Sequence, residues 1–190
     1  MAWLAVPVWF SVLYSALSLA VHFSTWGQVA PWPGELPGTT GTLLAHEIAH
    51  ASLGALAALP SRRVTPMVMA SLASVLIDVD HVGQLIGLPL VARSSHSVFF
   101  FLFAGIVLWL LARLGVFGRR VSPLLVGAVA AASVLAHMAV DAALPGSGMP
   151  LMAPFSPARF EVSGGVGVAL EGAAMSLVWL AWRYEMKRNR

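Results

Sequence analysis

Residues 41–60 of the chain read GTLLAHEIAHASLGALAALP. Apart from His46, Glu47 and His50 the stretch is apolar, small or uncharged, and it is as long as the roughly 20 residues that a helix needs to cross a bilayer. Ionisable side chains are costly to place in lipid, so their presence here indicates a function. The stretch therefore predicts a membrane-spanning helix that carries part of a site.

The composition also indicates a membrane protein. Of the 190 residues, 58% are hydrophobic and 10% are charged, whereas a soluble domain carries about 25% charged residues. So few charges cannot cover the surface of a soluble protein of this size. We therefore expect an all-α fold, a polytopic membrane helical bundle that forms a single integral-membrane domain over residues 1–190.

Six segments are apolar over about the length that a spanning helix requires. They cover approximately residues 3–23, 41–59, 67–89, 97–115, 123–144 and 164–182. Stretches rich in proline, glycine and arginine, such as PSRRVTP at 60–66 and RLGVFGRR at 113–120, separate some of them. We expect about six transmembrane helices.

Most basic residues fall on one side of a bundle with these six spans: Arg62, Arg63, Arg113, Arg119, Arg120, Arg183, Lys187, Arg188 and Arg190. Arg93 and Arg159 fall on the other side. Because cytoplasmic loops carry an excess of Lys and Arg, we expect both termini in the cytoplasm and the loops 24–40 and 145–163 outside. The basic residues are then topology anchors in a lipid bilayer, not a nucleic-acid surface. We expect a multi-pass protein of the cell membrane, specifically a bacterial inner membrane.

Histidine and acidic residues collect in the outer parts of the predicted spans. They are His46, Glu47, His50, Asp78, Asp80, His81, His96, His137 and Asp141. The predicted orientation places these groups, from four separate segments, at one depth near the external lipid surface. Each charged group costs about 2.5–3.5 kcal/mol at the centre of a spanning helix, so their concentration favours a site. His22, near the outer end of the first span, is assigned to the packed core.

Helical spacing arranges six of these residues in pairs. Three predicted helices each offer two side chains, three or four residues apart on one face: His46 with His50, Asp78 with His81, and His137 with Asp141. Bundle cores build metal sites from facing helices in this manner. The chain has no cysteine, so histidine and carboxylate must hold the metal, a set that suits zinc. Because one zinc takes four ligands, we expect one or two divalent ions, with surplus residues orienting the ligands.

Several motifs carry a resemblance to a known family. His50 and Gly54 are followed by LIDVDH at 76–81, RSSHS at 93–97 and LAHMAVDAALPGSGMPLMAPFSPARF at 135–160. Together they resemble the LexA-regulated, membrane-bound metal-dependent hydrolase family, the YdjM-like group. The resemblance implies a metal-dependent hydrolase. It implies metal-site positions at His50, Asp78, Asp80, His81, His96, His137 and Asp141, and Arg93 matches a motif arginine.

These considerations assign a role to each candidate residue. The preferred metal ligands are His50, Asp78, His81, His137 and Asp141, with His46 beside them. His96 is a further ligand or a general acid, and Asp80 orients a ligand or bridges two metals. The metal activates a water molecule for attack on an ester or phosphoester, with Glu47 as the candidate general base. Arg93, outside the hydrocarbon, holds an anionic head group, so we expect a lipid-like substrate at the outer leaflet.

Other interpretations remain open. HEIAH at 46–50 has the form of the zinc helix of site-2-type intramembrane proteases, in which two histidines hold zinc and the glutamate is the general base. Asp78 or Asp141 would supply the third ligand of such a protease. A buried path of His and Asp residues also suits an ion or proton transporter. The structural alternative is a hydrogen-bonded polar network that holds the helices together.

Overall fold

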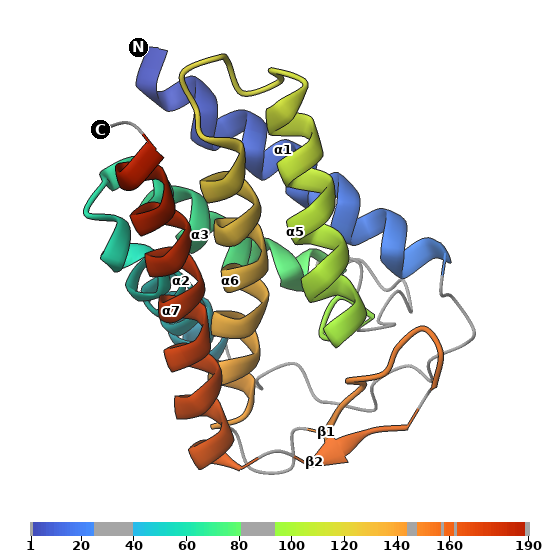
Figure 1. Ribbon diagram of the computed structural model, residues 1–190. Coiled ribbons are helices and arrows are strands. Elements are labelled where there is room, and N and C mark those ends of the chain that lie inside the picture. Colours follow the sequence, from blue (N-terminus) through green and yellow to red (C-terminus); the bar gives the residue numbers. More distant parts are fainter. Residues whose placement is uncertain are drawn as a thin grey trace.

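The computed structural model describes residues 2–24, 40–80, 94–143, 148–156, 158–161 and 163–188. In this part of the chain the fold is a bundle of α-helices with one small hairpin at its end (Figure 1). The helices are α1 (Ala2–Ser24), α2 (Thr40–Ala58), α3 (Val64–Leu76), α5 (Val98–Arg113), α6 (Pro123–Asp141) and α7 (Gly164–Arg188). Two 3₁₀ turns, η1 (Leu59–Ser61) and η2 (Ile77–Asp80), follow α2 and α3.

The expected all-α bundle is confirmed, and each predicted span corresponds to one described helix. Three of the described helices, α1, α6 and α7, are long and apolar enough to cross a membrane, and α3 and α5 are shorter apolar helices. The number of membrane crossings stays a prediction. Several helices expose apolar side chains at every fourth residue, for example Leu102, Ile106 and Leu110 on α5. This arrangement suits contact with lipid.

The central helix is α6, which contacts α5, α7, α2 and α3. It begins at Ser122, whose hydroxyl accepts the N–H of Leu125 at 3.1 Å, and Pro123 takes the first helical position. Small side chains let its neighbours approach closely: a Cβ atom at Gly127 would lie 2.8 Å from the carbonyl oxygen of Gly105 on α5. Nearly the whole helix is buried, so its polar residues face other helices.

The α2–α3 pair sets the level of the candidate ligands. The two helices pack together, and the turn between them ends at Arg62 in the left-handed region, with φ of 54°. They touch where a Cβ atom at Gly54 would lie 2.5 Å from the carbonyl oxygen of Ala70. His50 precedes Gly54 by one helical turn on α2, and Ser74 and Asp78 follow Ala70 by one and two turns. The contact between Gly54 and Ala70 thus brings His50 to the level of Ser74 and Asp78. The close approach at Gly54 therefore helps to position His50 relative to Asp78.

The third predicted span differs from the structure. The sequence predicts one helix over 67–89, but the α-helix ends at Leu76 and gives way to η2, in which Asp78 has φ of −83° and ψ of 15°. The last carbonyls of a helix lack partners within it, and that of Ser74 accepts a hydrogen bond from His137 Nδ1 at 2.7 Å. The predicted regular α-helix therefore does not extend to Asp78. The pairing of Asp78 with His81 stays a prediction, because His81 lies outside the described residues.

A hairpin, which the sequence did not predict, occupies the long loop before α7. Strands β1 (Gly148–Met149) and β2 (Phe160–Glu161) pair antiparallel, and Val98 at the start of α5 donates its N–H to the carbonyl of Leu151 at 3.0 Å. The hairpin lies at one end of the bundle, and both chain termini lie at the opposite end (Figure 1).

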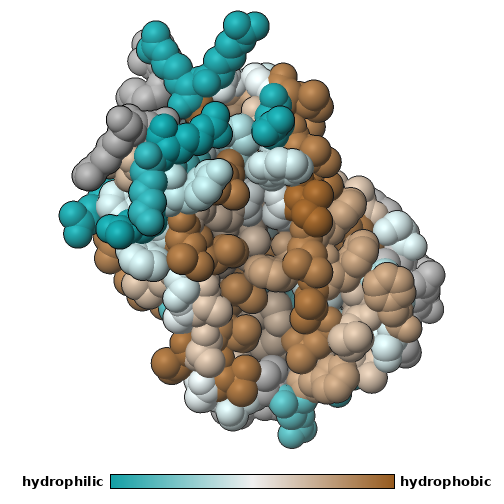
Figure 2. Space-filling model, in the orientation of Figure 1, coloured by the Kyte–Doolittle hydropathy of each residue, from teal (hydrophilic) through white to brown (hydrophobic). Residues whose placement is uncertain are grey.

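The hydrophilic and hydrophobic parts of the surface are separated along the same axis of the bundle, from the end with the termini to the end with the hairpin. Figure 2 shows hydrophilic side chains gathered mainly at the end with the termini, above a largely hydrophobic flank. The α2–α3 and α5–α6 connections and the end of α7 lie there (Figure 1), and they carry Arg62, Arg63, Arg113, Arg119, Arg120, Arg183, Lys187 and Arg188. The predicted segregation of basic residues to one side is thus seen in the fold, although which side is cytoplasmic stays a prediction.

Candidate metal centre

Six ionisable side chains from four segments meet inside the bundle, toward the hairpin end. They are His46 and His50 on α2, Asp78 in η2, His96 just before α5, and His137 and Asp141 on α6. Five of these side chains are at most 2% exposed, and His46 is 15% exposed. The site is therefore nearly closed, with its edge at His46.

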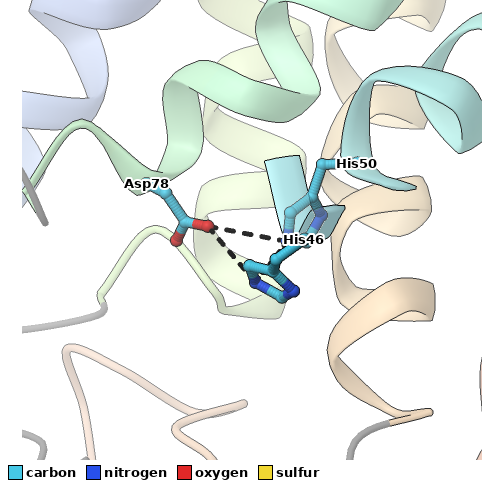
Figure 3. Close-up of side chains that lie close together, drawn as sticks. All are labelled: His46, His50 and Asp78. Carbon is cyan, nitrogen blue, oxygen red and sulfur yellow. Dashed lines mark hydrogen bonds and ion pairs between the residues drawn. The ribbon is translucent and has the colours of Figure 1, made fainter. Parts of the chain in front are cut away.

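Asp78 lies between two pairs of histidines. Its Oδ2 atom is 3.9 Å from His46 Nε2 and 3.5 Å from His50 Nε2, and Figure 3 shows these two imidazoles turned toward the carboxylate. Its Oδ1 atom is 3.3 Å from His96 Nε2 and 3.5 Å from His137 Nε2. Each carboxylate oxygen of Asp78 thus serves a different histidine pair.

Asp141 repeats this pattern from α6. Its Oδ1 atom is 3.7 Å from His46 Nε2 and 3.5 Å from His50 Nε2. Its Oδ2 atom is 3.4 Å from His96 Nε2 and 3.5 Å from His137 Nε2. All four imidazoles therefore direct the same ring nitrogen, Nε2, toward both carboxylates.

The histidines are also close within each pair and between pairs. The Nε2 atoms of His46 and His50 are 2.9 Å apart, and those of His96 and His137 are 2.8 Å apart. The rings of His50 and His137 stack with centroids 3.8 Å apart and planes at 8°. The two pairs are thus neighbours in one cluster, joined by the stacked rings and by the two aspartates.

The protonation of His137 indicates what the cluster can bind. A carbonyl oxygen only accepts hydrogen bonds, so the 2.7 Å contact with Ser74 places a proton on His137 Nδ1. In the neutral ring Nε2 then carries a lone pair, and this atom faces His96 Nε2 and the carboxylates of Asp78 and Asp141. A lone pair beside two carboxylates in a buried site favours a cation among them. A backbone carbonyl behind a histidine is also a common support for metal ligands.

A polar residue that the sequence analysis did not single out supports His96. Ser95 Oγ lies 3.4 Å from His96 Nδ1, 3.0 Å from His22 Nε2 and 3.4 Å from the carbonyl oxygen of Ile77. His22 is 4% exposed, as expected for a core residue, but it also belongs to this buried hydrogen-bonded group. In the sequence, the position of His22 near the outer end of the first predicted span, at the predicted depth of the other histidines, could have indicated that it lies near the site.

The other candidate residues belong to no metal-binding group among the described side chains, or lie outside the described residues. Glu47 is half-buried beside His46 on α2. The groups of described side chains within metal-binding reach of one another do not include it. The backbone of Asp80 belongs to η2, but its side chain lies outside the described residues, as do His81 and Arg93. Their predicted roles stay predictions.

The donor atoms suit a divalent cation. Three overlapping groups have ligand atoms within 4.8 Å of one another: His46, His50 and Asp78; His50, His137 and Asp141; and Asp78, His96 and His137. Imidazole nitrogen and carboxylate oxygen are ligands that zinc and several other first-row divalent metals accept. The cluster therefore has the composition and spacing of a metal site.

Comparison with known proteins identifies the family. The model of the YdjM inner membrane protein family matches residues 42–188, which include all six side chains of the cluster. No curated protein and no solved structure gives a match. The matched region also includes the motifs around Asp78, His96 and His137 that carry the resemblance seen in the sequence. The chain belongs to the YdjM family of inner membrane proteins.

Proposed function

We propose that the protein is a membrane-bound metal-dependent hydrolase that uses zinc. The observation that carries the proposal is the convergence of four imidazoles and two carboxylates, from four segments, on one buried point. A polar network that only joined helices would not need all four Nε2 atoms to face the same two carboxylates. A site with histidine and carboxylate ligands and no cysteine suits zinc in a hydrolytic role.

The chain's own residues define how the chemistry would be organised. A divalent cation lowers the pKa of a bound water toward about 7, which supplies hydroxide at neutral pH. His46, the most exposed of the six ligands, marks the side on which substrate approaches. Glu47 follows His46 in α2 and is the candidate general base. His96 is fully buried with Nε2 directed at Asp78, so we assign it as a ligand rather than a general acid.

The position of the cluster suggests the substrate. The site lies toward the end of the bundle away from the basic connections, which the positive-inside rule places in the cytoplasm. The site then lies near the outer leaflet, where an ester or phosphoester of a lipid-like molecule is within reach. Arg93 precedes His96 in the sequence and is expected to lie outside the hydrocarbon, so we assign it to binding of an anionic head group.

Purified protein in detergent provides the test. We expect zinc to copurify and phospholipid or other lipid ester to be hydrolysed. Asp141→Asn should lower the rate by more than the roughly 10–100-fold loss that follows removal of an outer partner of a metal ligand. Glu161→Gln, which changes an exposed carboxylate on β2, is the matched control and should retain full activity. A wild-type protein that holds no metal would contradict the proposal.

One observation favours a second candidate, an intramembrane zinc protease. His46 and His50 lie side by side on α2, and Asp78 from a later segment comes within reach of both (Figure 3). A protease of this type needs Glu47 as its general base. Cleavage of a transmembrane peptide that is lost in Glu47→Gln would favour the protease, whereas hydrolysis of lipid esters without cleavage of any such peptide would exclude that mechanism.

A further inference from the structure

The cluster has two halves that share their carboxylates. One half consists of the Nε2 atoms of His46 and His50 with Oδ2 of Asp78 and Oδ1 of Asp141. The other half consists of the Nε2 atoms of His96 and His137 with the remaining oxygen of each aspartate. Each half therefore presents two nitrogens and two oxygens, and neither aspartate directs both oxygens to the same half.

The nitrogen–oxygen distances within each half are close to those in the coordination shell of one ion, whereas the two nitrogens of each half, 2.8–2.9 Å apart, are nearer to each other than in such a shell. A tetrahedral zinc with bonds of about 2.0–2.1 Å separates its ligand atoms by roughly 3.3 Å. The nitrogen–oxygen separations are 3.5–3.9 Å in the half with His46 and 3.3–3.5 Å in the half with His96. Eight donor atoms exceed the four that one zinc takes, so a single ion would leave half of them without a role.

We infer that the cluster holds two divalent cations, each bound by two histidines, with Asp78 and Asp141 bridging them. The sequence analysis offered Asp80 as a residue that orients a ligand or bridges two metals. The side chain of Asp80 lies outside the described residues, and the geometry points to Asp78 and Asp141 as the bridges. The inference rests on the metal binding of the proposed function, but it does not depend on hydrolysis.

Protons are the competing cations in such a cluster. The Nε2 atoms within each histidine pair are 2.8–2.9 Å apart, which leaves room for one proton between them. If Nδ1 of every ring is also protonated, the two shared protons make each histidine pair a cation and balance the two aspartates, and such a cluster would hold no metal. Metal content therefore separates the two arrangements directly.

Two ions also narrow the substrate class. Two divalent cations carry four positive charges against the two of the bridging aspartates, so the centre retains a net positive charge and favours an anion. Paired metal ions stabilise the attacking and leaving oxygens of a displacement at phosphorus. The bridged centre therefore favours a phosphoester, such as a phospholipid head group, over a neutral carboxylic ester.

Manganese loading tests the inference. Protein stripped with chelator and reloaded with Mn²⁺ is expected to bind two equivalents per chain and to give the electron paramagnetic resonance spectrum of an exchange-coupled pair. His46→Ala removes a ligand from one half only, so it should bind one equivalent and lose the coupled signal. Glu161→Gln is the control and should behave as wild type.

The outcomes separate this inference from the proposed function. One equivalent in the wild type, no binding, or two equivalents without coupling would overturn the bridged pair. An active protein with one bound ion would contradict the two-ion inference but support the hydrolase proposal. Two coupled ions without hydrolysis of any lipid ester would support the two-ion inference but contradict the hydrolase proposal. Because the decisive measurement uses wild-type protein, a variant that fails to fold does not block the test.

A different observation concerns the opposite end of the bundle. A cavity of about 380 Å³ lies between the start of α6 and the end of α7, and its charged lining consists of Arg63, Arg119, Arg120, Arg188 and Glu185. The lining contains four arginines and one glutamate, so its net charge is positive. Guanidinium groups bind phosphate oxygens in a bidentate manner.

An apolar groove continues from this cavity. The groove has a volume of about 200 Å³ and is lined by Val6, Met69, Val126 and Val129 from α1, α3 and α6. The two spaces share lining residues, including Arg63 and Arg120. A basic cavity with room for a phosphate-bearing head group, next to an apolar groove, matches the two chemical parts of a phospholipid.

We propose that an anionic phospholipid binds here, with its phosphate in the basic cavity and the start of an acyl chain in the groove. Basic pockets between membrane helices bind anionic head groups in this way. The site is separate from the metal cluster, which lies toward the other end of the bundle. It would stabilise the protein without taking part in its chemistry.

Thermal unfolding in detergent, with added lipid, tests this second proposal. Phosphatidylglycerol should raise Tm, while phosphatidylcholine and inorganic phosphate should not. The double variant Arg119→Gln/Arg120→Gln should lose the shift, and Arg113→Gln, whose guanidinium lies over Trp109, should keep it. Equal shifts with both lipids, a shift with phosphate alone, or an unchanged double variant would overturn the proposal.

Discussion

A hydrogen bond to the backbone fixes the orientation of the His137 side chain in the candidate site. Its Nδ1 donates to the Ser74 carbonyl, which is available because α3 ends nearby, and this bond turns Nε2 toward Asp78 and Asp141. The orientation of the ring is thus set by a backbone atom and not by a neighbouring side chain. No substitution of Ser74 removes that carbonyl, so this support tolerates sequence change at residue 74.

Ser95 gives a single-residue prediction. Its hydroxyl lies between His22 and the Nδ1 atom of the candidate ligand His96, so Ser95→Ala removes an outer partner of the site. We expect metal affinity to fall by about 10–100-fold, measured by competition with a coloured chelator. Ser176→Ala is the control, because Ser176 bonds only to its own helix at Gly172 in an exposed position. Equal affinities in the two variants would show that Ser95 does not support the ligand.

Among the helices, α2 and α3 have the closest approach that bears on the site. The contact between Gly54 and Ala70 leaves no room for a side chain. It lies one turn along α2 from His50, which brings that imidazole within 3.5 Å of Asp78. Helix separation here controls the distance between ligands from different segments, because cores respond to added volume by shifting whole elements.

Gly54→Ala is therefore expected to weaken both stability and metal binding. The added methyl group meets the Ala70 carbonyl at 2.5 Å and should cost about 1–3 kcal/mol of unfolding free energy, as overpacking does. Chemical unfolding and metal titration in the same detergent provide the two measurements. Gly172→Ala on α7 is the matched control, because nothing lies within 4 Å of the new Cβ atom. A Gly54→Ala protein as stable as wild type, with unchanged affinity, would contradict the role of the close contact.

For the whole molecule, the cluster acts as a cross-link between segments far apart in the chain. It joins α2, η2, the residue before α5, and α6. A cation that binds the folded protein alone stabilises it by mass action, by about 4 kcal/mol when free metal is roughly 1,000 times Kd. The metal is thus expected to contribute to the stability of the bundle as well as to its chemistry.

Chelator should lower Tm of the wild-type protein. Removal of the metal leaves two carboxylates and four imidazoles crowded in a buried site, and unfolding relieves that crowding. Differential scanning fluorimetry with and without chelator measures the shift, and added zinc should reverse it. Asp141→Asn, already deprived of a ligand, should respond much less. An unchanged Tm in wild-type protein would show that the fold does not depend on the cluster.

The orientation in the membrane gives a further prediction for the whole protein. The chain lacks cysteine, so single introduced cysteines report topology without background. Ser156→Cys, near the hairpin, should react in intact cells with a maleimide that cannot cross the inner membrane, while Lys187→Cys should react only after lysis. The reverse pattern would place the metal cluster on the cytoplasmic side and remove the argument for an outer-leaflet substrate.

The sequence alone predicted much of the fold and the components of the site. Hydrophobic segments with basic connections predict the helices, because lipid excludes unpaired backbone and charge. The spacing of His46 with His50 and of His137 with Asp141 places each pair on one helical face, since helix periodicity is local. The end of α3 at Leu76 was not predicted, because the apolar run continues past it and nothing in the run itself marks the change to η2.

Only the tertiary structure decided how the components combine. The contacts of each Asp78 oxygen with a different histidine pair, the position of His96 against His137, and the support from Ser95 and Ser74 cannot be read from the sequence. They depend on packing between residues 18 to 73 positions apart in the chain. Residue spacing carries no information about such distances, because they are set by how closely small residues such as Gly54 let the helices approach.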